Sequence, residues 1–434
     1  MAGCALFNSD QLAKLEEFNK TKRVVAVLVM WKCPFFTQFE DFHKPDDAAL
    51  IGIIQEQIRD DTPKCVLEHF DLIIWYKADY SKYEDVLLDW SILDIPTVTQ
   101  AVAEICEVVE PKKMKLIEMM EHTINLVCNL REKHSIPGPR KEDLEEFLDF
   151  SNISSPSDML KTVSAVCEQM EHEEKENNAF TPIFRKPICG MGSAGSGKIE
   201  SRQELVHWIT EECQEKNKGS YLIEQYIDGR EFWAIVCLLP NNNWRPLYIV
   251  DFLIGDCLEK GDPITFCSHR FEDAQAQFPN VDKFVGLCIE KIKPPHPHLF
   301  CVQGFQVSPG TDNYLFTECS YRMNGARGCG IGYGSAGISL ETALISCHID
   351  PNYAADPDPH WQMPRFESQI WWPYKVGTLR SCNEFPEEST VLHKANSLVH
   401  FVVRAKVRNC NEQQLRQDVA WIESNWTPDI VDDN

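Results

Sequence analysis

The sequence lacks any excess of basic residues. It carries 42 Lys and Arg against 66 Asp and Glu, which gives a formal net charge of −24 at pH 7. Phosphate backbones and anionic lipid surfaces are bound through clustered cations, so a chain with this charge is repelled by both. The composition therefore argues against nucleic acid and membrane surfaces as partners.

Zinc motifs, a secretory leader and a lipidation motif are also lacking. None of the 18 cysteines forms a CxxC pair, and neither His296 with His298 nor Cys267 with His269 is joined to a second pair at zinc-site spacing. The stretch MAGCALFNSDQLAKLEEF has no apolar signal segment, and Ala2 stands where myristoylation needs glycine. We therefore expect a cytosolic protein whose cysteines are reduced thiols.

The first part of the chain predicts an αβ domain. At 434 residues, of which 43% are hydrophobic, the chain is long enough for two or three domains. A helix is predicted over Asn8–Asn19, and the β-branched runs Arg23–Met30 and Phe70–Tyr76 predict strands buried on both faces. A helix predicted over Asp47–Arg59 lies between them. This order predicts a βαβ unit and a parallel sheet.

A long helix is predicted to close this domain. The segment Lys113–Lys133 has apolar residues at helical spacing and basic residues in its last turn. It stops at the sequence Ile-Pro-Gly-Pro, residues 136–139, which places a domain boundary at residue 138.

A glycine-rich loop follows a short strand in the middle of the chain. Thr181–Pro187 predicts a strand that carries Lys186, and it runs into Gly190–Lys198. Closely spaced glycines let backbone N–H groups approach an anion, as a loop around phosphates requires. The segment also starts like a P-loop, but Ile199 stands where the magnesium-binding Ser or Thr is needed, which disfavours that interpretation.

Two acidic residues flank the next turn. Leu222–Ile227 and Glu231–Leu239 predict two strands of a hairpin joined by a tight Asp-Gly turn. Glu224 and Glu231 lie on either side of this turn. Their carboxylates suit hydrogen bonds to an adenine amino group and to ribose hydroxyls, or they are solvent-facing hairpin residues.

A second hairpin carries further charged residues. Phe300–Val307 and Tyr314–Cys319 predict paired strands around a turn rich in Pro, Gly, Asp and Asn. Glu318 lies near the end of the second strand, with Arg322 and Arg327 soon after it. A carboxylate beside two guanidinium groups suits a site for a metal and an anion, and the alternative is a surface ion pair on an edge hairpin.

The remaining segments predict supporting structure. The glycine-rich run Gly330–Gly337 predicts a tight loop, with a place near the site as the less favoured alternative. A packed loop is predicted over Trp361–Tyr374 and a final helix over Glu412–Asn425. Strands are predicted over Lys375–Leu379 and Ser397–Lys406.

The order of these motifs resembles the ATP-grasp superfamily. A Lys-Pro strand enters a glycine-rich loop, EQYIDGREF follows, and a strand pair ends in ECSYRMNGARG. Within the superfamily, residues 101–434 are similar to the carboxylate–amine ligases, the branch that contains carnosine synthase and bacterial L-amino-acid ligases. The resemblance implies an α+β fold in which two lobes clasp ATP, preceded by a pre-ATP-grasp αβ domain with a parallel sheet. The implied domains are residues 1–138, a small lobe over 139–222 that is shortened near 150–158, and a large lobe with a terminal subdomain over 223–434.

The resemblance also implies the residues of the site. The implied contacts to ATP are made by Lys186, Gly192, Ser193, Gly195, Glu224, Tyr226, Ile227 and Glu231. The implied Mg²⁺ ligands are Glu318, Gln306 and Ser320. The residues implied near the reacting carboxylate or acyl phosphate are Arg322 and Arg327.

Three departures from the family pattern open a second interpretation. Gln306 stands where the family has an acidic metal ligand, Ser320 replaces an asparagine, and residues 149–158 lack the family's early lysine. The first interpretation is a Mg-ATP-dependent ligase that joins a small-molecule carboxylate to an amine. The alternative is a degenerate ATP-grasp protein that binds nucleotide or ligand without efficient turnover. The sequence leaves the substrates and the oligomeric state open, a homodimer included.

Overall fold

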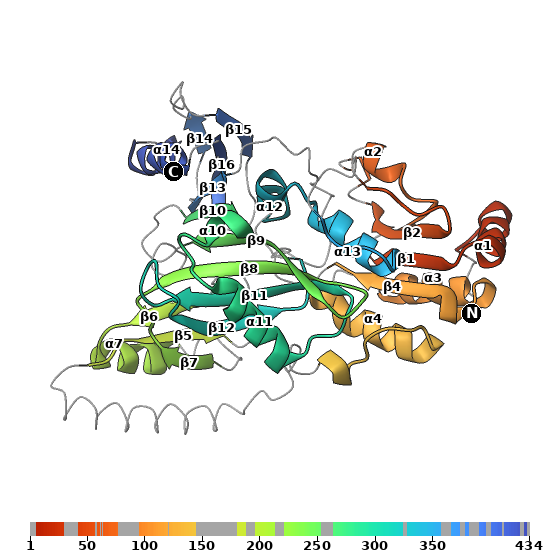
Figure 1. The fold of residues 1–434 in the computed structure, drawn as a ribbon, viewed down its shortest axis with the longest axis horizontal. Helices are drawn as coiled ribbons and strands as arrows, with labels where there is room; N and C mark the ends of the chain where they lie inside the picture. Colours follow the sequence, from red (N-terminus) through yellow and green to blue (C-terminus); the bar gives the residue numbers. More distant parts are fainter. Residues whose placement is uncertain are drawn as a thin grey trace.

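Three sheets organise the chain (Figure 1). The computed structural model describes residues 6–29, 42–56, 59–60, 62, 64–76, 95–119, 121–144, 180–187, 196–212, 221–252, 264–323, 328–356, 366–373, 378–381, 390–395, 401–409, 412–425 and 429–431. We call its four-stranded, three-stranded and eight-stranded sheets the N-terminal, small and large sheets; a two-stranded sheet lies near the C-terminus. Over the described residues, every helix is too short or too polar to cross a bilayer.

The N-terminal sheet is parallel throughout, in the order β3-β2-β1-β4. Its elements are α1 (Ser9–Thr21), β1 (Val24–Val29), β2 (Ala48–Gln55), α2 (Lys64–Leu67), β3 (Leu72–Tyr76), α3 (Ile95–Val108), a 3-10 turn (Pro111–Lys113), β4 (Met114–Glu118), α4 (Glu121–His134) and a 3-10 turn (Glu142–Leu144). The side chains of α1, α3 and α4 cover one face of the sheet. The predicted parallel sheet is therefore confirmed.

Two helix predictions in this region are wrong. The segment Asp47–Arg59 contains the strand β2, whose eight residues are all buried. It lies between β1 and β3, where both faces of the sheet are covered. A strand in this position is apolar on both faces, which explains a sequence without a polar side. The segment Lys113–Lys133 begins as the strand β4, which pairs with β1, and only its second part is the helix α4.

The small sheet has the order β6-β5-β7 and is antiparallel. Its elements are β5 (Ile183–Pro187), β6 (Gly197–Ile199), α7 (Arg202–His207), a π-helical turn (Trp208–Glu212) and β7 (Tyr221–Gln225). Ile183 and Ile199 pack with Leu205 and Trp208, so the helical segment covers one face of this sheet. The other face is directed toward the large sheet.

The large sheet is antiparallel, in the order β12-β11-β8-β9-β10-β13-β16-β15. Its elements are β8 (Arg230–Leu238), β9 (Trp244–Phe252), β10 (Ile264–Arg270), α10 (Phe271–Ala274), α11 (Val281–Ile292), β11 (His298–Gln306), β12 (Tyr314–Ser320), α12 (Gly328–Ala336), α13 (Leu340–Ile349), β13 (Phe366–Pro373), β15 (Thr390–Ala395) and β16 (Phe401–Asn409). The C-terminal elements are β14 (Thr378–Ser381), α14 (Glu412–Asn425) and β17 (Asp429–Val431).

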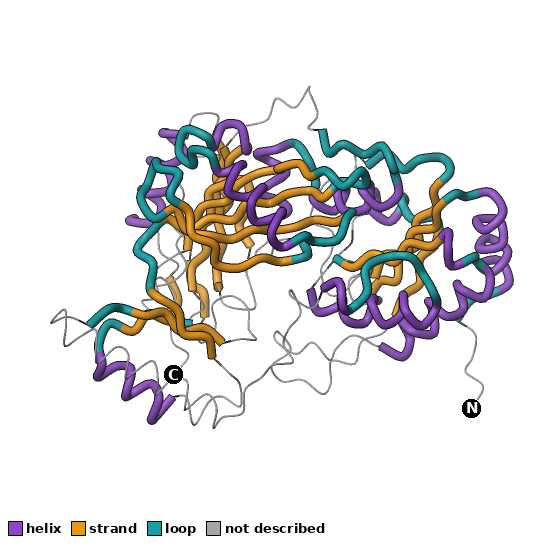
Figure 2. Tube along the Cα trace, turned by 60° about the horizontal axis from the view of Figure 1, so that its bottom comes forward, coloured by secondary structure: helices purple, strands orange, loops and turns teal. Residues whose placement is uncertain are grey.

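Each face of the large sheet has its own cover. The helix α11 packs on one face, around Phe232 and Phe300. The helix α13 packs on the opposite face, where Ile235 and Leu299 join a core that continues into the N-terminal sheet. The small sheet and α7 form a separate layer beside the β8–β11–β12 end (Figures 1 and 2).

Two loop predictions are wrong. The glycine-rich run over residues 330–337 lies mostly within the helix α12. A Cβ atom at Gly332 would overlap the ring of Tyr248, and one at Gly334 would overlap the carboxylate of Glu367, so these glycines let the helix approach the sheet closely. The segment Trp361–Tyr374 contains β13, which pairs with β10 and β16.

Candidate nucleotide-binding site

The side chain of Lys186 joins the small sheet to the large sheet. Its Nζ atom lies 3.0 Å from Oε2 of Glu224 on β7 and 3.7 Å from Oε2 of Glu318 on β12. The Lys186 side chain is 18% exposed and the Glu318 side chain is 50% exposed, so the ammonium lies between the sheets while the carboxylate opens to solvent. Three residues predicted from the sequence therefore meet in one place.

Strand register puts these groups on the inner face of the small sheet. Phe184 is paired with Glu224, and Lys186 is paired with Leu222. Paired residues project to the same side of a sheet, and residues two apart along a strand share a face. The opposite face carries Ile183 against α7, so the apolar alternation of β5 directs Lys186 toward the large sheet.

The large sheet supplies a matching row of side chains. Gln303 on β11 is paired with Glu318 on one side and with Trp233 on the other. Glu231 is paired with Phe305, one step along the same face. Nε2 of Gln303 donates a hydrogen bond of 2.6 Å to Oε1 of Glu231. The carboxylates of Glu231 and Glu318 therefore lie on either side of the Gln303 strand.

The Glu231 carboxyl has a perturbed affinity for protons. Burial raises its pKa to about 7, the hydrogen bond from Gln303 lowers it, the nearby charge of Glu318 raises it and that of Lys186 lowers it. Desolvation prevails because it disfavours the charged form more than one neutral donor favours it. The carboxyl is thus close to half ionised at neutral pH.

A four-residue segment connects the last strand of the small sheet, β7, to the first strand of the large sheet, β8. The predicted hairpin between residues 222 and 239 is wrong, because β7 pairs with β5 whereas β8 pairs with β9 and β11. Tyr226 follows β7 and donates its backbone N–H to the Pro182 carbonyl at 3.1 Å. Gly229 precedes β8, and a Cβ atom there would lie 2.8 Å from the Gln306 carbonyl oxygen. Residues 226–229, including Ile227, therefore form a tethered crossing between the sheets.

The structure does not bring Gln306 to the Glu318 carboxylate. Gln306 is fully buried, and its Nε2 donates to the backbone carbonyls of Gln277 and Thr311, both at 2.8 Å. It lies three residues beyond Gln303 on a strand that pairs regularly with β8, so it faces the opposite side of the sheet. A metal-binding role for Gln306 therefore has no support from its position.

The other predicted residues lie on β12, just beyond it, or outside the described residues. Ser320 follows Glu318 by two residues on β12. Nη1 of Arg322 donates to the Met323 carbonyl at 2.8 Å, just beyond the strand. Gly192, Ser193, Gly195 and Arg327 lie outside the described residues.

Sequence reasoning missed several residues on the inner faces. They are Phe184, Leu222, Trp233, Gln303, Phe305 and Leu315. Alternation along a strand finds Phe184 from Lys186, Leu222 from Glu224 and Trp233 from Glu231. Gln303, Phe305 and Leu315 are placed by the pairing of β11 with its neighbours, which the sequence does not show. Leu222 and Leu315 are 44% and 43% exposed, so each inner face carries an exposed apolar side chain beside its charged groups.

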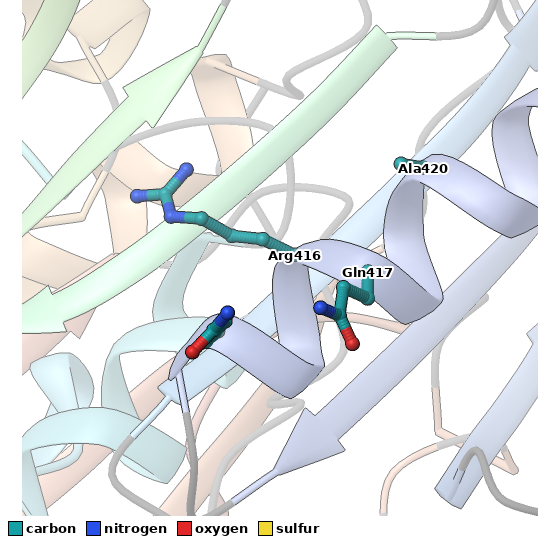
Figure 3. A pocket seen from close by; sticks show the side chains of 4 residues that line it. Arg416, Gln417 and Ala420 are labelled. Atoms are coloured by element: carbon teal, nitrogen blue, oxygen red, sulfur yellow. The ribbon is translucent and has the colours of Figure 1, made fainter.

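An open pocket of about 430 Å³ lies elsewhere, against the helix α14 (Figure 3). Its lining comes from one helix, with Arg416, Gln417 and Ala420 among the lining residues. Nη2 of Arg416 donates to Oε1 of Gln277 at 2.9 Å, so this side chain anchors α14. None of the carboxylates described above lines this pocket.

The histidines that could suggest zinc have other polar neighbours. Nδ1 of His298 lies 3.3 Å from Nε2 of His348, and Nε2 of His269 lies 2.7 Å from Oδ1 of Asp251. Burial lowers the pKa of His298 to about 4. Within the described ranges, no three His, Cys, Asp or Glu side chains gather as metal ligands do.

The arrangement of the sheets matches the fold of ATP-grasp proteins, and the predicted fold is confirmed. No protein-family model matches the sequence, and no curated protein matches it by sequence. Among solved structures, the chain is similar to the L-amino acid ligase from Bacillus licheniformis, with a TM-score of 0.58 and 12% identity over 95% of this chain and 100% of that one.

Two further solved structures share the fold. The N5-carboxyaminoimidazole synthetase from Staphylococcus aureus, complexed with ADP, has a TM-score of 0.55 and 13% identity over 94% of this chain and 99% of that one. The biotin carboxylase from Campylobacter jejuni has a TM-score of 0.54 and 13% identity over 94% and 92% of the two chains.

Proposed function

We propose that the chain is a Mg-ATP-dependent ligase that joins a small-molecule carboxylate to an amine. The observation that carries this proposal is the meeting of Lys186, Glu224 and Glu318 between two sheets that are linked by a short crossing. A phosphate chain needs cations, and a purine needs a slot between two surfaces. The ADP complex of the S. aureus neighbour supports nucleotide binding in this fold.

Each described side chain has a role that its chemistry supports. The ammonium of Lys186 attracts the phosphates, and ATP would draw it away from its carboxylate partners. Glu224 and the backbone at Tyr226 and Ile227 suit the amino group and ring nitrogens of adenine. Glu231 suits ribose hydroxyls, since a carboxylate accepts hydrogen bonds from neutral donors.

The donor set at Glu318 fits magnesium. Mg²⁺ takes oxygen ligands and is commonly held by one or two carboxylates together with substrate phosphates. The half-exposed Glu318 carboxylate offers such a ligand, and the hydroxyl of Ser320 is a weaker one nearby. Bound there, the ion would supply charge neutralisation for the transferred phosphoryl group.

The proposed reaction has two balanced steps. A carboxylate oxygen of the acid attacks the γ-phosphorus of ATP, so an acyl phosphate forms and ADP leaves. The amine then attacks the acyl carbon, inorganic phosphate leaves with the bonding electrons, and the nitrogen loses a proton. Arg322 and Arg327 are proposed to hold the anionic acid and acyl phosphate, and the loop carrying Gly192, Ser193 and Gly195 to cover the phosphates and exclude water.

A nucleotide-binding protein without turnover is the second candidate. One observation favours it: the β11 residue paired with Glu318 is the neutral Gln303, which is bonded to Glu231. A neutral amide offsets less metal charge than a carboxylate does. The two candidates agree on ATP binding and differ in chemistry.

Product formation separates the candidates. The protein is mixed with ATP, Mg²⁺ and pairs drawn from a panel of amino acids; ADP is followed by a coupled assay and amide products by mass spectrometry. The ligase proposal expects ADP formation that requires an acid, with sustained turnover and an amide product only when an amine is also present. Binding of ATP without ADP release under every pair would support the second candidate.

The matched variants are Glu318→Gln and Glu290→Gln. Glu290 lies on α11 with its side chain 73% exposed, so its substitution serves as the control. Loss of the metal-bound carboxylate should lower kcat by about 100-fold or more, by analogy with losing one transition-state contact. Equal ADP release by wild type and Glu318→Gln would refute the role of Glu318.

A further inference from the structure

Gln303 lies on the strand between the two carboxylates of the large sheet. Its neighbours across the inner face are Trp233 and Glu318, and its Nε2 donates to Oε1 of Glu231 at 2.6 Å. We propose that Gln303 is a positioning residue that fixes the Glu231 carboxylate for sugar hydroxyls, so that the site selects ribonucleotides over deoxyribonucleotides. The inference rests on the proposed function, because it needs a nucleotide between the sheets.

The hydrogen bond orients one particular oxygen. The 2.6 Å contact between the Gln303 amide N–H and the Glu231 carboxyl is a short hydrogen bond. It engages Oε1 of Glu231 and holds that oxygen toward β11, so Oε2 is the oxygen without a contact to Gln303. The Lys186 ammonium lies between Glu224 and Glu318 instead, so it does not neutralise Glu231 through direct contact.

The neutrality of Gln303 determines what Glu231 binds well. A lysine or arginine at this position would pair with the carboxylate as an ion pair, whereas an amide orients it without adding a charge. Sugar hydroxyls are neutral donors, and hydrogen bonds to a charged acceptor are stronger than those between neutral groups.

The surroundings of Glu231 make a missing hydroxyl costly. Phe305 is paired with Glu231 on β11 and is flanked by Leu315 on β12, so an apolar surface adjoins the carboxylate. A site built to bond a hydroxyl rejects an analogue without it, because the polar protein group is left unpaired. We expect ATP to bind about tenfold or more tightly than at least one of 2′-deoxy-ATP and 3′-deoxy-ATP.

The experiment compares three nucleotides with four proteins. Dissociation constants of ATP, 2′-deoxy-ATP and 3′-deoxy-ATP are measured by calorimetry for wild type, Gln303→Met, Gln303→Glu and the control Gln417→Met on the exposed face of α14. Both Gln303 variants remove the amide donor, and the second preserves its shape. Circular dichroism checks that each variant is folded.

The expected result is a loss of discrimination. The ratio of deoxy-ATP to ATP dissociation constants should fall from about tenfold or more toward one in both Gln303 variants and stay unchanged in Gln417→Met. If Gln303 had only a structural role, its substitution would weaken the binding of all three nucleotides equally. The ratio of their dissociation constants would then be unchanged.

Three other outcomes would overturn the inference, and each contradicts a different step of it. If wild type binds all three nucleotides equally, Glu231 does not bind the sugar hydroxyls. If either folded Gln303 variant keeps the wild-type ratio, Gln303 does not position Glu231, and the proposed function stands. If wild type binds no ATP at all, both the inference and the proposed function fail.

Discussion

Replacing Glu231 by glutamine should stabilise the protein at the expense of nucleotide binding. Burial raises the pKa of this carboxyl from its ordinary 4.5 to about 7, against the opposing hydrogen bond from Gln303. The folded protein therefore holds the proton more tightly than the unfolded chain does. Unfolding releases a proton between about pH 4.5 and pH 7, so stability falls as the pH rises through this window.

The size of the effect follows from the two pKa values. One pKa unit corresponds to 1.36 kcal/mol, so ionising Glu231 in its folded environment costs about 3 kcal/mol above pH 7. Glutamine has the same shape and keeps an oxygen that accepts from Gln303. We expect Glu231→Gln to match wild type in stability at pH 5 and to exceed it by up to about 3 kcal/mol at pH 8.

Urea unfolding followed by tryptophan fluorescence measures this difference, without nucleotide and with a chelator present. Wild type, Glu231→Gln and the control Glu290→Gln are unfolded at several values between pH 5 and pH 8. The control should track wild type at every pH because its carboxylate is exposed. If the Glu231→Gln and wild-type curves also run parallel, the inferred titration of Glu231 is wrong.

Two further predictions concern Lys186 and a buried ion pair. Lys186→Met should weaken ATP binding by about tenfold or more, because the phosphates lose a cation between the sheets; an unchanged dissociation constant in calorimetry would contradict this. Arg131→Met should lower the free energy of unfolding by about 3–5 kcal/mol, because it strands Glu118, which lies 2.6 Å from Arg131 with both side chains almost fully buried. Urea unfolding measures the loss, and a value below about 1 kcal/mol would refute it.

Local chemistry was enough to predict several elements. The hairpin of β11 and β12 follows from two apolar runs around a turn rich in Pro, Gly, Asp and Asn, and the structure has both strands and their antiparallel pairing. The strand β1 follows from an uninterrupted apolar run rich in valine, all of which is buried. The helix α14 was predicted over the residues that form it, Glu412–Asn425.

Elements decided by distant partners were not predictable from local pattern. The run AALIGIIQ suits a buried helix or a buried strand, and its place between β1 and β3 decides for a strand. An Asp-Gly sequence favours a hairpin, yet β7 finds its partner in β5 and β8 finds its partners in β9 and β11. What looked like a turn is therefore a crossing between sheets.

A β-bulge separates Gln306 from the face of the sheet that carries Glu318. Counting back along the sequence from Glu318 led to Gln306, which faces the buried side of the sheet. The pairing passes from Gln303 with Glu318 to Gly304 with Phe316, so Thr317 is an extra residue on β12. A one-residue bulge shifts which side chains face each other, and sequence spacing does not reveal it.

The apolar core shared by the N-terminal and large sheets joins residues between positions 24 and 355 into one packed block. Leu28 and Leu50 from the N-terminal sheet pack in the same cluster as Ile235, Leu299 and Leu344. Deleting the first 118 residues would remove the N-terminal part of this cluster and expose the apolar side chains that it covers. We expect the remaining chain to aggregate. The small sheet, by contrast, has its own cluster of four buried residues, so its packing does not depend on that block.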